Sequence, residues 1–92
     1  MDENVVYIGR KPPTSYVLAV MRQFREGADE VKIKARGKAI NRAVDVVEIT
    51  KNRFLSDIEI EDIQIGTEEV QRDDESIKLS TIEITLKVTK EQ

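Results

Sequence analysis

The chain of 92 residues contains no cysteine, no histidine and no tryptophan. Without cysteine it forms no disulfide and offers no thiolate site for zinc. Without histidine it lacks the side chain that most often acts as a general base or metal ligand near neutral pH. Catalysis through carboxylates or lysine stays open, but no spacing in the sequence assembles such a site. We therefore expect a protein that is not an enzyme and uses no cofactor or metal.

Long hydrophobic runs are also missing. No segment approaches the roughly 20 apolar residues of a transmembrane helix, and no basic start precedes the apolar core of a signal peptide. Hydrophobic residues make up 39% of the chain, which is enough for one modest core at this length. These features predict a single soluble, cytoplasmic domain over residues 1–92, with neither a membrane partner nor a small-molecule substrate.

The formal net charge of −3 combines two halves of opposite sign. Residues 10–56 carry eleven Lys and Arg against five Asp and Glu, whereas residues 57–92 carry four against eleven. Local potential, rather than net charge, governs contact with phosphate. The basic half is therefore compatible with a nucleic-acid partner, although charge asymmetry alone does not establish one.

A strand and a helix are expected in the first quarter of the chain. Residues 4–9 form a short continuous apolar run, typical of a strand that is covered on most sides. A double proline then requires a loop. Apolar side chains at helical spacing predict a helix over residues 14–26, capped by Thr14 or Ser15 and ended by Gly27.

The middle of the chain predicts a strand followed by a long helix. Residues 30–36 alternate between apolar and basic side chains, as in a strand with one buried face. Gly37 ends this alternation, and the second helix is expected over residues 38–53. Its apolar stripe is wider than the roughly 100° that a helix on a sheet needs. Either this helix lies deeper in its own core or it covers a partner subunit; the small size of the chain favours the partner.

The last third predicts two long strands joined by a turn at Arg72–Ser76. In each strand the apolar alternation shifts by one residue, at Glu61–Asp62 and at Ser80–Thr81. Such a shift indicates a β-bulge, and two of them predict a bent hairpin that extends beyond the sheet. The elements then follow as strand–helix–strand–helix–strand–strand. We expect an α/β two-layer sandwich, with a mixed four-stranded sheet and both helices on one face.

Three segments of the sequence resemble the Alba family of archaeal nucleic-acid-binding proteins. They are NVVYIGRKP from Asn4, KARGKAINRAVDVVEITKNRF from Lys34 and STIEITLK from Ser80. The resemblance extends in order from Asn4 to Lys87. It implies a fold like the C-terminal domain of translation initiation factor 3. It also implies a homodimer that binds double-stranded DNA and RNA with little sequence preference, and that coats or compacts nucleic acid in chromatin and RNA maintenance.

The residues and the resemblance together define a candidate nucleic-acid surface. Arg10 and Lys11 lie in a stiff loop before a helix N-terminus, where free backbone N–H groups already attract anions. Basic residues gather again where the second strand turns into the second helix, although ion pairs with Asp45 or Glu26 are an alternative there. The resemblance implies that the hairpin reaches toward the minor groove, and Arg72 is the cation at its tip. The candidate nucleic-acid-binding residues are Arg10, Lys11, Arg36, Lys38, Asn41, Arg42 and Arg72.

Self-association has its own candidate residues. Ile40, Val44 and Val47 belong to the wide apolar stripe, and the resemblance implies that Phe54 lies where dimers meet along DNA. The resemblance further implies Lys11 as an acetylation target, because it is the lysine of the first loop. On the same grounds we expect a chromosome-associated protein.

Two features depart from the family pattern. The chain is net acidic, and three acids follow Arg72 in the hairpin turn, where they would repel phosphate. These features motivate two alternatives on the same fold: a protein–protein adaptor, or a weak and selective RNA binder.

Overall fold

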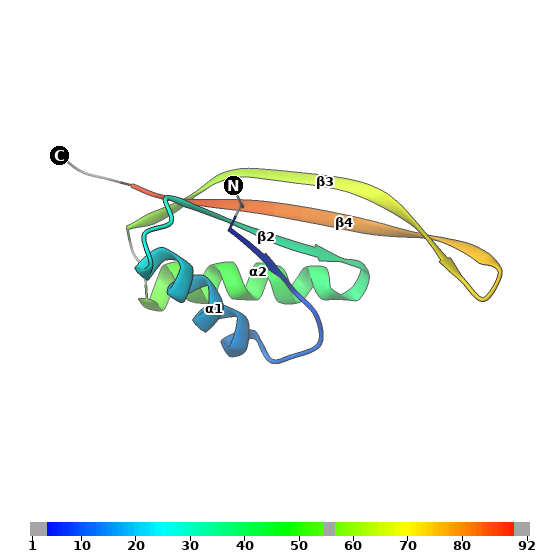
Figure 1. The fold of residues 1–92 in the computed structure, drawn as a ribbon, viewed down its shortest axis with the longest axis horizontal. Helices are drawn as coiled ribbons and strands as arrows, with labels where there is room; N and C mark the ends of the chain where they lie inside the picture. Colours follow the sequence, from blue (N-terminus) through cyan, green and yellow to red (C-terminus); the bar gives the residue numbers. More distant parts are fainter. Residues whose placement is uncertain (1–3, 55–56, 90–92) are drawn as a thin grey trace.

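Two helices cover one face of a four-stranded sheet, and a long hairpin extends from that sheet (Figure 1). The computed structural model describes residues 4–54 and 57–89. Within these residues the elements are β1 (Val5–Tyr7), α1 (Pro13–Arg25), β2 (Glu30–Arg36), the 3₁₀ turn η1 (Gly37–Ala39), α2 (Ile40–Ile49), the π-turn η2 (Thr50–Phe54), β3 (Ile58–Arg72) and β4 (Glu75–Val88). None of the described helices has the length and apolar character needed to span a membrane.

The strands lie side by side in the order β1–β2–β4–β3. β1 is parallel to β2, and the other neighbours are antiparallel. A parallel pair needs a crossover connection, which α1 supplies between β1 and β2. The predicted order of elements, the mixed sheet and the placement of both helices on one face are confirmed.

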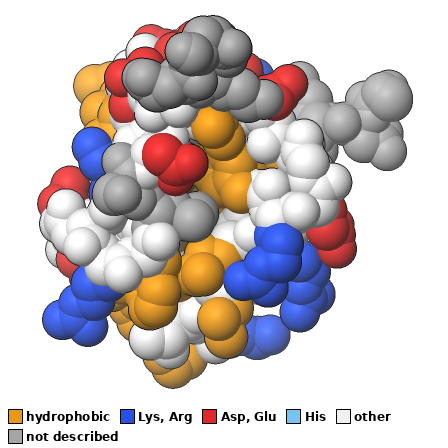
Figure 2. All heavy atoms as spheres, turned by 90° about the vertical axis from the view of Figure 1, so that its left-hand side faces the viewer, with side chains coloured by type: hydrophobic (Ala, Val, Ile, Leu, Met, Phe, Trp, Pro, Cys, Tyr) orange, Lys and Arg blue, Asp and Glu red, His pale blue; other side chains and the backbone are white. Residues whose placement is uncertain are grey.

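The core lies between the helices and the covered face of the sheet. β2 has the predicted alternation, since Val31 and Ile33 are buried while Lys32 and Lys34 lie on the opposite face. Burying one aliphatic side chain of this size contributes about 1.5–3 kcal/mol. At the end of the molecule away from the hairpin, hydrophobic side chains also reach the surface among charged ones (Figure 2). The buried hydrophobic residues are Val6, Ile8, Val17, Val20, Val31, Ile33, Ala35, Ala43, Val46, Val47, Ile58, Ile84 and Leu86.

The first strand is shorter and more open than its apolar run predicted. β1 spans only Val5–Tyr7, and although Val6 is buried, Tyr7 is 71% exposed. The prediction of a strand covered on most sides is therefore wrong. The reason is that both helices lie on one face of the sheet and leave the other face of β1 open.

The first helix begins one residue earlier than predicted. Pro12 occupies the N-cap position and Pro13 opens α1, so neither Thr14 nor Ser15 caps the helix with its side chain. Proline suits the first helical position because the N–H it lacks would have no partner inside the helix. The predicted end is confirmed, since Gly27 follows the helix with a φ of +107°, which glycine adopts without strain.

The second helix is continuous but irregular. Gly37, with a φ of +59°, lets the chain leave β2 and enter the 3₁₀ turn. After α2, the π-turn extends the helical path to Phe54, so that the path covers the predicted residues 38–53. At the junction, the buried Thr50 hydroxyl donates to the carbonyl oxygen of Val46 at 2.7 Å. Side-chain bonds of this kind often bend helices.

The hairpin of β3 and β4 gives the molecule a long axis of 53 Å. We call its outer part, residues 66–80, the arm. The predicted bulge in β3 is confirmed, because the register skips Glu61. The predicted bulge in β4 is wrong, because Ser80 and Thr81 pair with Thr67 and Gly66 with no residue skipped.

The apolar side chains of β4 switch from one face of the strand to the other because different parts of the protein cover the strand along its length. Ile84 and Leu86 are buried in the core under the helices. Leu79, on the opposite parity, instead lies beside Gly37, where a Cβ atom added to the glycine would be 3.6 Å from Leu79 Cδ2. In the arm, which extends beyond the helices, Leu79 on the opposite side of the strand is the side chain that contacts the rest of the chain. This change of covered side explains the shifted alternation without a bulge.

The arm ends in a two-residue turn at Asp73–Asp74, narrower than the predicted turn at Arg72–Ser76. Both aspartates have positive φ values, 49° and 66°. Two-residue hairpin turns of this kind have a twist that matches the flanking strands. Asp and Asn enter this left-handed conformation more readily than most L-residues, which accounts for acids at the tip.

Candidate nucleic-acid interface

Arg10 and Lys11 lie exposed in the loop between β1 and α1. The loop is anchored by Tyr16 on the first turns of α1. The Tyr16 hydroxyl oxygen accepts the backbone N–H of Gly9 at 2.9 Å and the backbone N–H of Lys11 at 3.0 Å. Since the double proline after Lys11 restricts the loop further, both cations project from a well-defined backbone.

Arg42 on α2 joins the second helix to the same loop. Its Nη1 donates to the carbonyl oxygen of Gly9 at 2.5 Å. This bond goes to Gly9 rather than to Asp45 or Glu26, the ion-pair partners considered from the sequence. One of the five N–H donors of the guanidinium is used in this bond, so Arg42 holds the loop as well as adding charge beside it.

The β1–α1 loop and the β2–α2 turn lie at the same edge of the sheet. β1 and β2 are parallel, so both chain segments leave the sheet in the same direction. Arg36, Lys38 and Asn41 are exposed at the β2–α2 turn. The structure thus gathers six of the seven predicted residues at one edge. We call this group the basic edge: Arg10, Lys11, Arg36, Lys38, Asn41 and Arg42.

One cation of the basic edge already has an acidic partner. Arg36 Nη1 lies 2.9 Å from Glu68 Oε2, at the base of the arm. About half of each side chain is exposed, so water screens the pair and its contribution to stability is small. A phosphate at this turn would compete with Glu68 for the guanidinium.

Arg72 is the predicted residue that the fold does not bring to the basic edge. It is the last residue of β3, and this strand ends at the tip of the arm (Figure 1). It pairs in register with Glu75 across the Asp73–Asp74 turn. Any contact that it makes with nucleic acid depends on where the arm reaches.

The predicted self-association residues differ in exposure. Val44 is 42% exposed and Phe54 is 52% exposed, while Ile40 is partly buried. Val47 requires a correction: it is only 2% exposed in the single chain and belongs to that chain's own core. Much of the wide stripe on the second helix is therefore covered within the subunit, where Ala43, Val46 and Val47 are buried.

Sequence reasoning missed a second set of exposed apolar side chains, on β3. Ile60, Ile63 and Ile65 are 37%, 53% and 81% exposed. Ile63 pairs with the buried Ile84, so its side chain points to the helical side of the sheet. β3 is the edge strand of the sheet and these side chains stay open there. Their alternation was visible in the sequence, but their exposure depends on which strands the helices cover.

Tyr16 was also missed as part of the interface. The available signal was a tyrosine three residues after a double proline, close enough to the loop for its hydroxyl to reach back. Helical spacing places it near the core, and Tyr16 does pack partly against the core. Its hydroxyl is what connects α1 to the loop.

The arrangement of a sandwich, a basic edge and a two-stranded arm defines an Alba-type fold. The chain superposes on the solved structure of Alba from Thermoplasma volcanium with a TM-score of 0.88 and 48% identity, covering 91% of this chain and 99% of that one. It also matches ALBA1 from Trypanosoma brucei with a TM-score of 0.76 and 27% identity, over 96% of this chain and 71% of the other.

A model of the Alba family matches residues 4–67, and the chain belongs to this family. It is 55% identical over 87 residues to the DNA/RNA-binding protein Alba of Methanocella arvoryzae, covering 94% of this chain and 91% of the relative. It is 54% identical over 86 residues to the DNA/RNA-binding protein Alba 1 of Archaeoglobus fulgidus, covering 94% and 97%. These names describe binding proteins, in agreement with the prediction that the chain is not an enzyme.

Proposed function

We propose that the chain forms a dimer that binds double-stranded DNA and RNA through their phosphates, with little preference for sequence. The observation that carries this proposal is the anchored loop. Arg10 and Lys11 project from a backbone that Tyr16 and Arg42 hold at the basic edge. The names of the relatives support nucleic acid as the partner class.

Phosphate contact fits the chemistry of the basic edge. Arg10, Lys11, Arg36 and Lys38 are exposed on or beside the two connections at this edge. The β1–α1 loop also precedes the N-terminus of α1, where unpaired backbone N–H groups favour anions. Contacts to phosphate fix the position of a protein on a duplex but read no bases. A surface made mainly of such contacts therefore supports broad binding rather than a preferred site.

A dimer accounts for the apolar surface that one chain leaves open. Val44, Ile60, Ile63 and Ile65 are exposed on the same chain whose charged residues make up 36% of the sequence. A second copy can cover such a surface through a two-fold contact that uses the same side chains from both subunits. It would also double the number of basic edges and arms that one duplex can meet.

Coating of nucleic acid at the chromosome follows from the same proposal. Phe54 is 52% exposed at the end of η2, and it serves in our proposal as a contact between neighbouring dimers on DNA. Acetylation of Lys11 would remove one positive charge from the anchored loop and weaken binding. Arg10, beside it, keeps its charge under lysine acetylation.

The test is duplex binding titrated from low to physiological salt. Five or six phosphate contacts predict a slope of about −5 for the logarithm of affinity against the logarithm of salt concentration. The double variant Arg10→Gln, Lys11→Gln should weaken binding to every duplex alike and reduce the magnitude of the slope by about 2 for each subunit whose basic edge contacts the duplex. A matched control is Arg22→Gln, Arg25→Gln, which removes two exposed cations from the last turn of α1.

Three results would contradict the proposal. The first is affinity that does not change with salt, and the second is an equal loss of affinity in the control variant. The third is a loss confined to one duplex sequence, which would indicate base readout instead of phosphate contact.

The acidic arm favours a second candidate, an adaptor that binds another protein. Glu68, Glu69, Asp73, Asp74 and Glu75 all lie on the arm, where they would repel a phosphate backbone. Capture of partners from a lysate before and after nuclease treatment separates the two functions. Partners that persist without nucleic acid support the adaptor, and partners that are lost support nucleic-acid binding. Competition between duplex DNA and duplex RNA then tests for RNA preference.

A further inference from the structure

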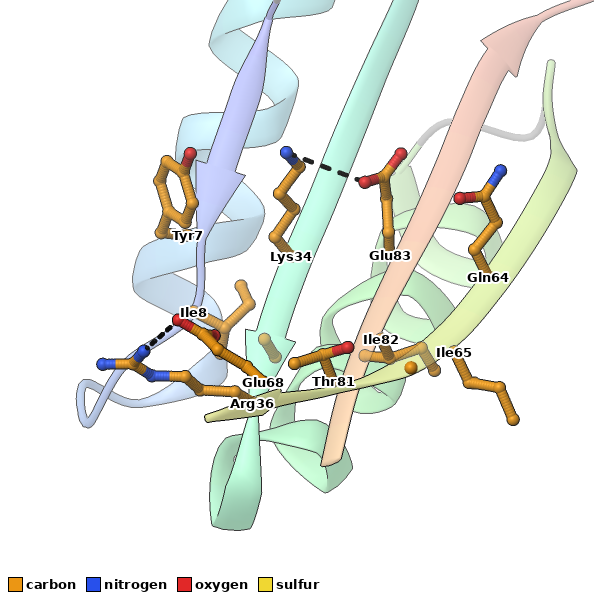
Figure 3. A pocket seen from close by; sticks show the side chains of 12 residues that line it. Tyr7, Ile8, Lys34, Arg36, Gln64, Ile65, Glu68, Thr81, Ile82 and Glu83 are labelled. Carbon is orange, nitrogen blue, oxygen red and sulfur yellow. Dashed lines mark hydrogen bonds and ion pairs between the residues drawn. The ribbon is translucent and has the colours of Figure 1, made fainter. Parts of the chain in front are cut away.

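The sheet face opposite the helices contains an open groove of about 720 Å³ (Figure 3). Side chains from all four strands line it, and Gly66 forms part of its floor. The missing side chain at Gly66 matters, because an added Cβ would lie 3.3 Å from Thr81 Oγ1. A larger residue at Gly66 would therefore crowd the floor of the groove.

Four side chains form a row across the groove, one from each strand. The strand registers align Tyr7 with Lys34, Lys34 with Glu83, and Glu83 with Gln64. Figure 3 shows these side chains pointing away from the helices, in this order. The row thus presents an aromatic ring, a cation, a carboxylate and an amide at the spacing of neighbouring strands, about 5 Å apart.

Tyr7 is the one aromatic side chain of the row, and packing in the core does not account for its position. Its side chain is 71% exposed, on a face where its neighbours are charged or polar. Lys34 Nζ lies 5.9 Å from the centroid of its ring, within the range of a cation–π contact. The ammonium group lies over the ring, yet Tyr7 as a whole stays open to solvent, so the ring keeps surface on which a flat ligand can stack.

The charges inside the groove balance one another. The carboxylate oxygens of Glu83 lie 3.6 Å from Nζ of Lys32 and 3.6 Å from Nζ of Lys34. Nη1 of Arg36 lies 2.9 Å from Oε2 of Glu68. A phosphate placed within the groove would meet carboxylates as well as cations. A flat, uncharged ligand with hydrogen-bonding edges suits it better, and an unpaired nucleobase has that chemistry.

The groove is continuous with the basic edge. Arg36 belongs to both, and Tyr7 precedes Arg10 by three residues, which is about 10 Å of extended chain. A single strand whose phosphates contact Arg10 and Lys11 can therefore place a base over the Tyr7 ring. A duplex cannot do so, since its bases are paired and stacked inside the helix.

We propose that this groove is a subsite for single-stranded nucleic acid, in which an unpaired base stacks on Tyr7 while the backbone stays at the Arg10–Lys11 loop. The proposal rests on the proposed function for its phosphate contacts. Stacking on aromatic side chains tolerates any base, because every base has a π-face. The same protein then has two modes: phosphate contact for duplexes, and phosphate contact plus stacking for single strands.

The variant Tyr7→Trp places a fluorescent probe in the groove, and its signal reports ligand binding there because the chain has no other tryptophan. Stacking of a base should quench the fluorescence of this tryptophan during titration with single-stranded oligouridylate, and duplex RNA at the same salt should not. The matched control is Leu18→Trp, since Leu18 is 63% exposed on α1, on the helical side of the sheet. A single strand of abasic sugars, which keeps the phosphates and lacks the bases, should not quench either variant.

Affinity gives a second, independent measurement. Tyr7→Ala should weaken single-strand binding about 5- to 150-fold, the factor expected for one stacked base, and leave duplex binding unchanged. Tyr7→Phe keeps the ring and should bind like the native chain. Thermal unfolding of each variant shows whether the fold is retained.

Two outcomes overturn the subsite: equal quenching by abasic and base-containing strands, or an equal loss of single-strand and duplex binding in Tyr7→Ala. Failure of the proposed function looks different, because duplex binding would then be absent from the native chain at any salt concentration. Quenching of the Tyr7→Trp variant by oligouridylate would still measure the groove in that case.

Discussion

Arg36, the last residue of β2, is paired with Glu68 of the arm: Nη1 of the arginine lies 2.9 Å from Oε2 of the glutamate. The pair joins the basic half of the chain to the acidic half across 32 positions of sequence. It also occupies a cation of the basic edge before any ligand arrives. The acidic arm therefore contacts the basic edge directly, through this one ion pair.

Glu68→Gln should strengthen duplex binding, because Arg36 would no longer have to exchange a carboxylate for a phosphate. One additional phosphate contact raises the magnitude of the salt slope by about 0.9. The measurement is the salt titration of duplex affinity on native and variant protein. Glu59→Gln is the control, since Glu59 is an exposed acid on β3 outside the arm. An equal gain in both variants would mean that only net charge changed.

The order and type of the elements were predictable because most of them show, in the sequence, the hydrophobic period of a helix or of a strand with one buried face. In β2 the alternation placed Val31 and Ile33 in the core and Lys32 and Lys34 outside, as found. The turn at Gly37 and the bulge at Glu61 were also predicted correctly. A glycine after the strand indicates the first, and a one-residue shift of the apolar alternation indicates the second.

What could not be predicted depends on contacts between distant segments. Val44 and Val47 both belong to the apolar stripe of the second helix, yet Val44 is 42% exposed and Val47 only 2%. How α2 packs against the sheet determines which of the two is buried, and the sequence does not show this. Tyr7 looked buried because the apolar run does not reveal that one sheet face has no covering layer. The cations of the candidate site were chosen from their charge and from the family resemblance, whereas the two hydrogen bonds of Tyr16 are visible only in the folded loop.

Tyr16→Phe should loosen the β1–α1 loop, because the backbone N–H groups of Gly9 and Lys11 lose their shared acceptor. Both groups are near solvent, so water can replace the hydroxyl, and the free energy of unfolding should fall by only about 1 kcal/mol. Duplex affinity should fall several-fold, since Arg10 and Lys11 would no longer be held in place. Denaturant unfolding and duplex titration measure the two effects.

Tyr7→Phe is the control for Tyr16→Phe, because it removes a tyrosine hydroxyl from the open sheet face instead. Its duplex affinity and its stability should match those of the native chain. If Tyr16→Phe were also to bind duplexes like the native chain, the anchoring bonds would not contribute to binding.

Asp73→Asn combined with Asp74→Gly should stabilise the tip of the arm. The two aspartates hold positive φ values of 49° and 66°, and Asn-Gly is the pair that this hairpin turn favours. Relief of the left-handed conformation contributes about 1 kcal/mol locally, so amide hydrogen exchange at the tip should slow. The control Asp73→Asn, Asp74→Asn removes the same charge without adding glycine. If both variants slowed exchange equally, charge repulsion rather than backbone conformation would be the cause.

Ile63→Glu should convert the proposed dimer to a monomer. Ile63 is 53% exposed on the helical side of β3, and a two-fold contact would bury two copies of the new carboxylate without a partner, at a cost of several kcal/mol. Leu18→Glu, on α1, places the same charge at a residue that is 63% exposed and should leave the mass unchanged. Sedimentation equilibrium measures the mass of each variant. Because the monomer has one basic edge, its duplex affinity should fall well below that of the dimer, whose second edge binds at high effective concentration. A native chain that sediments as a monomer would rule out the dimer, and a dimer that persists in Ile63→Glu would locate its interface away from β3.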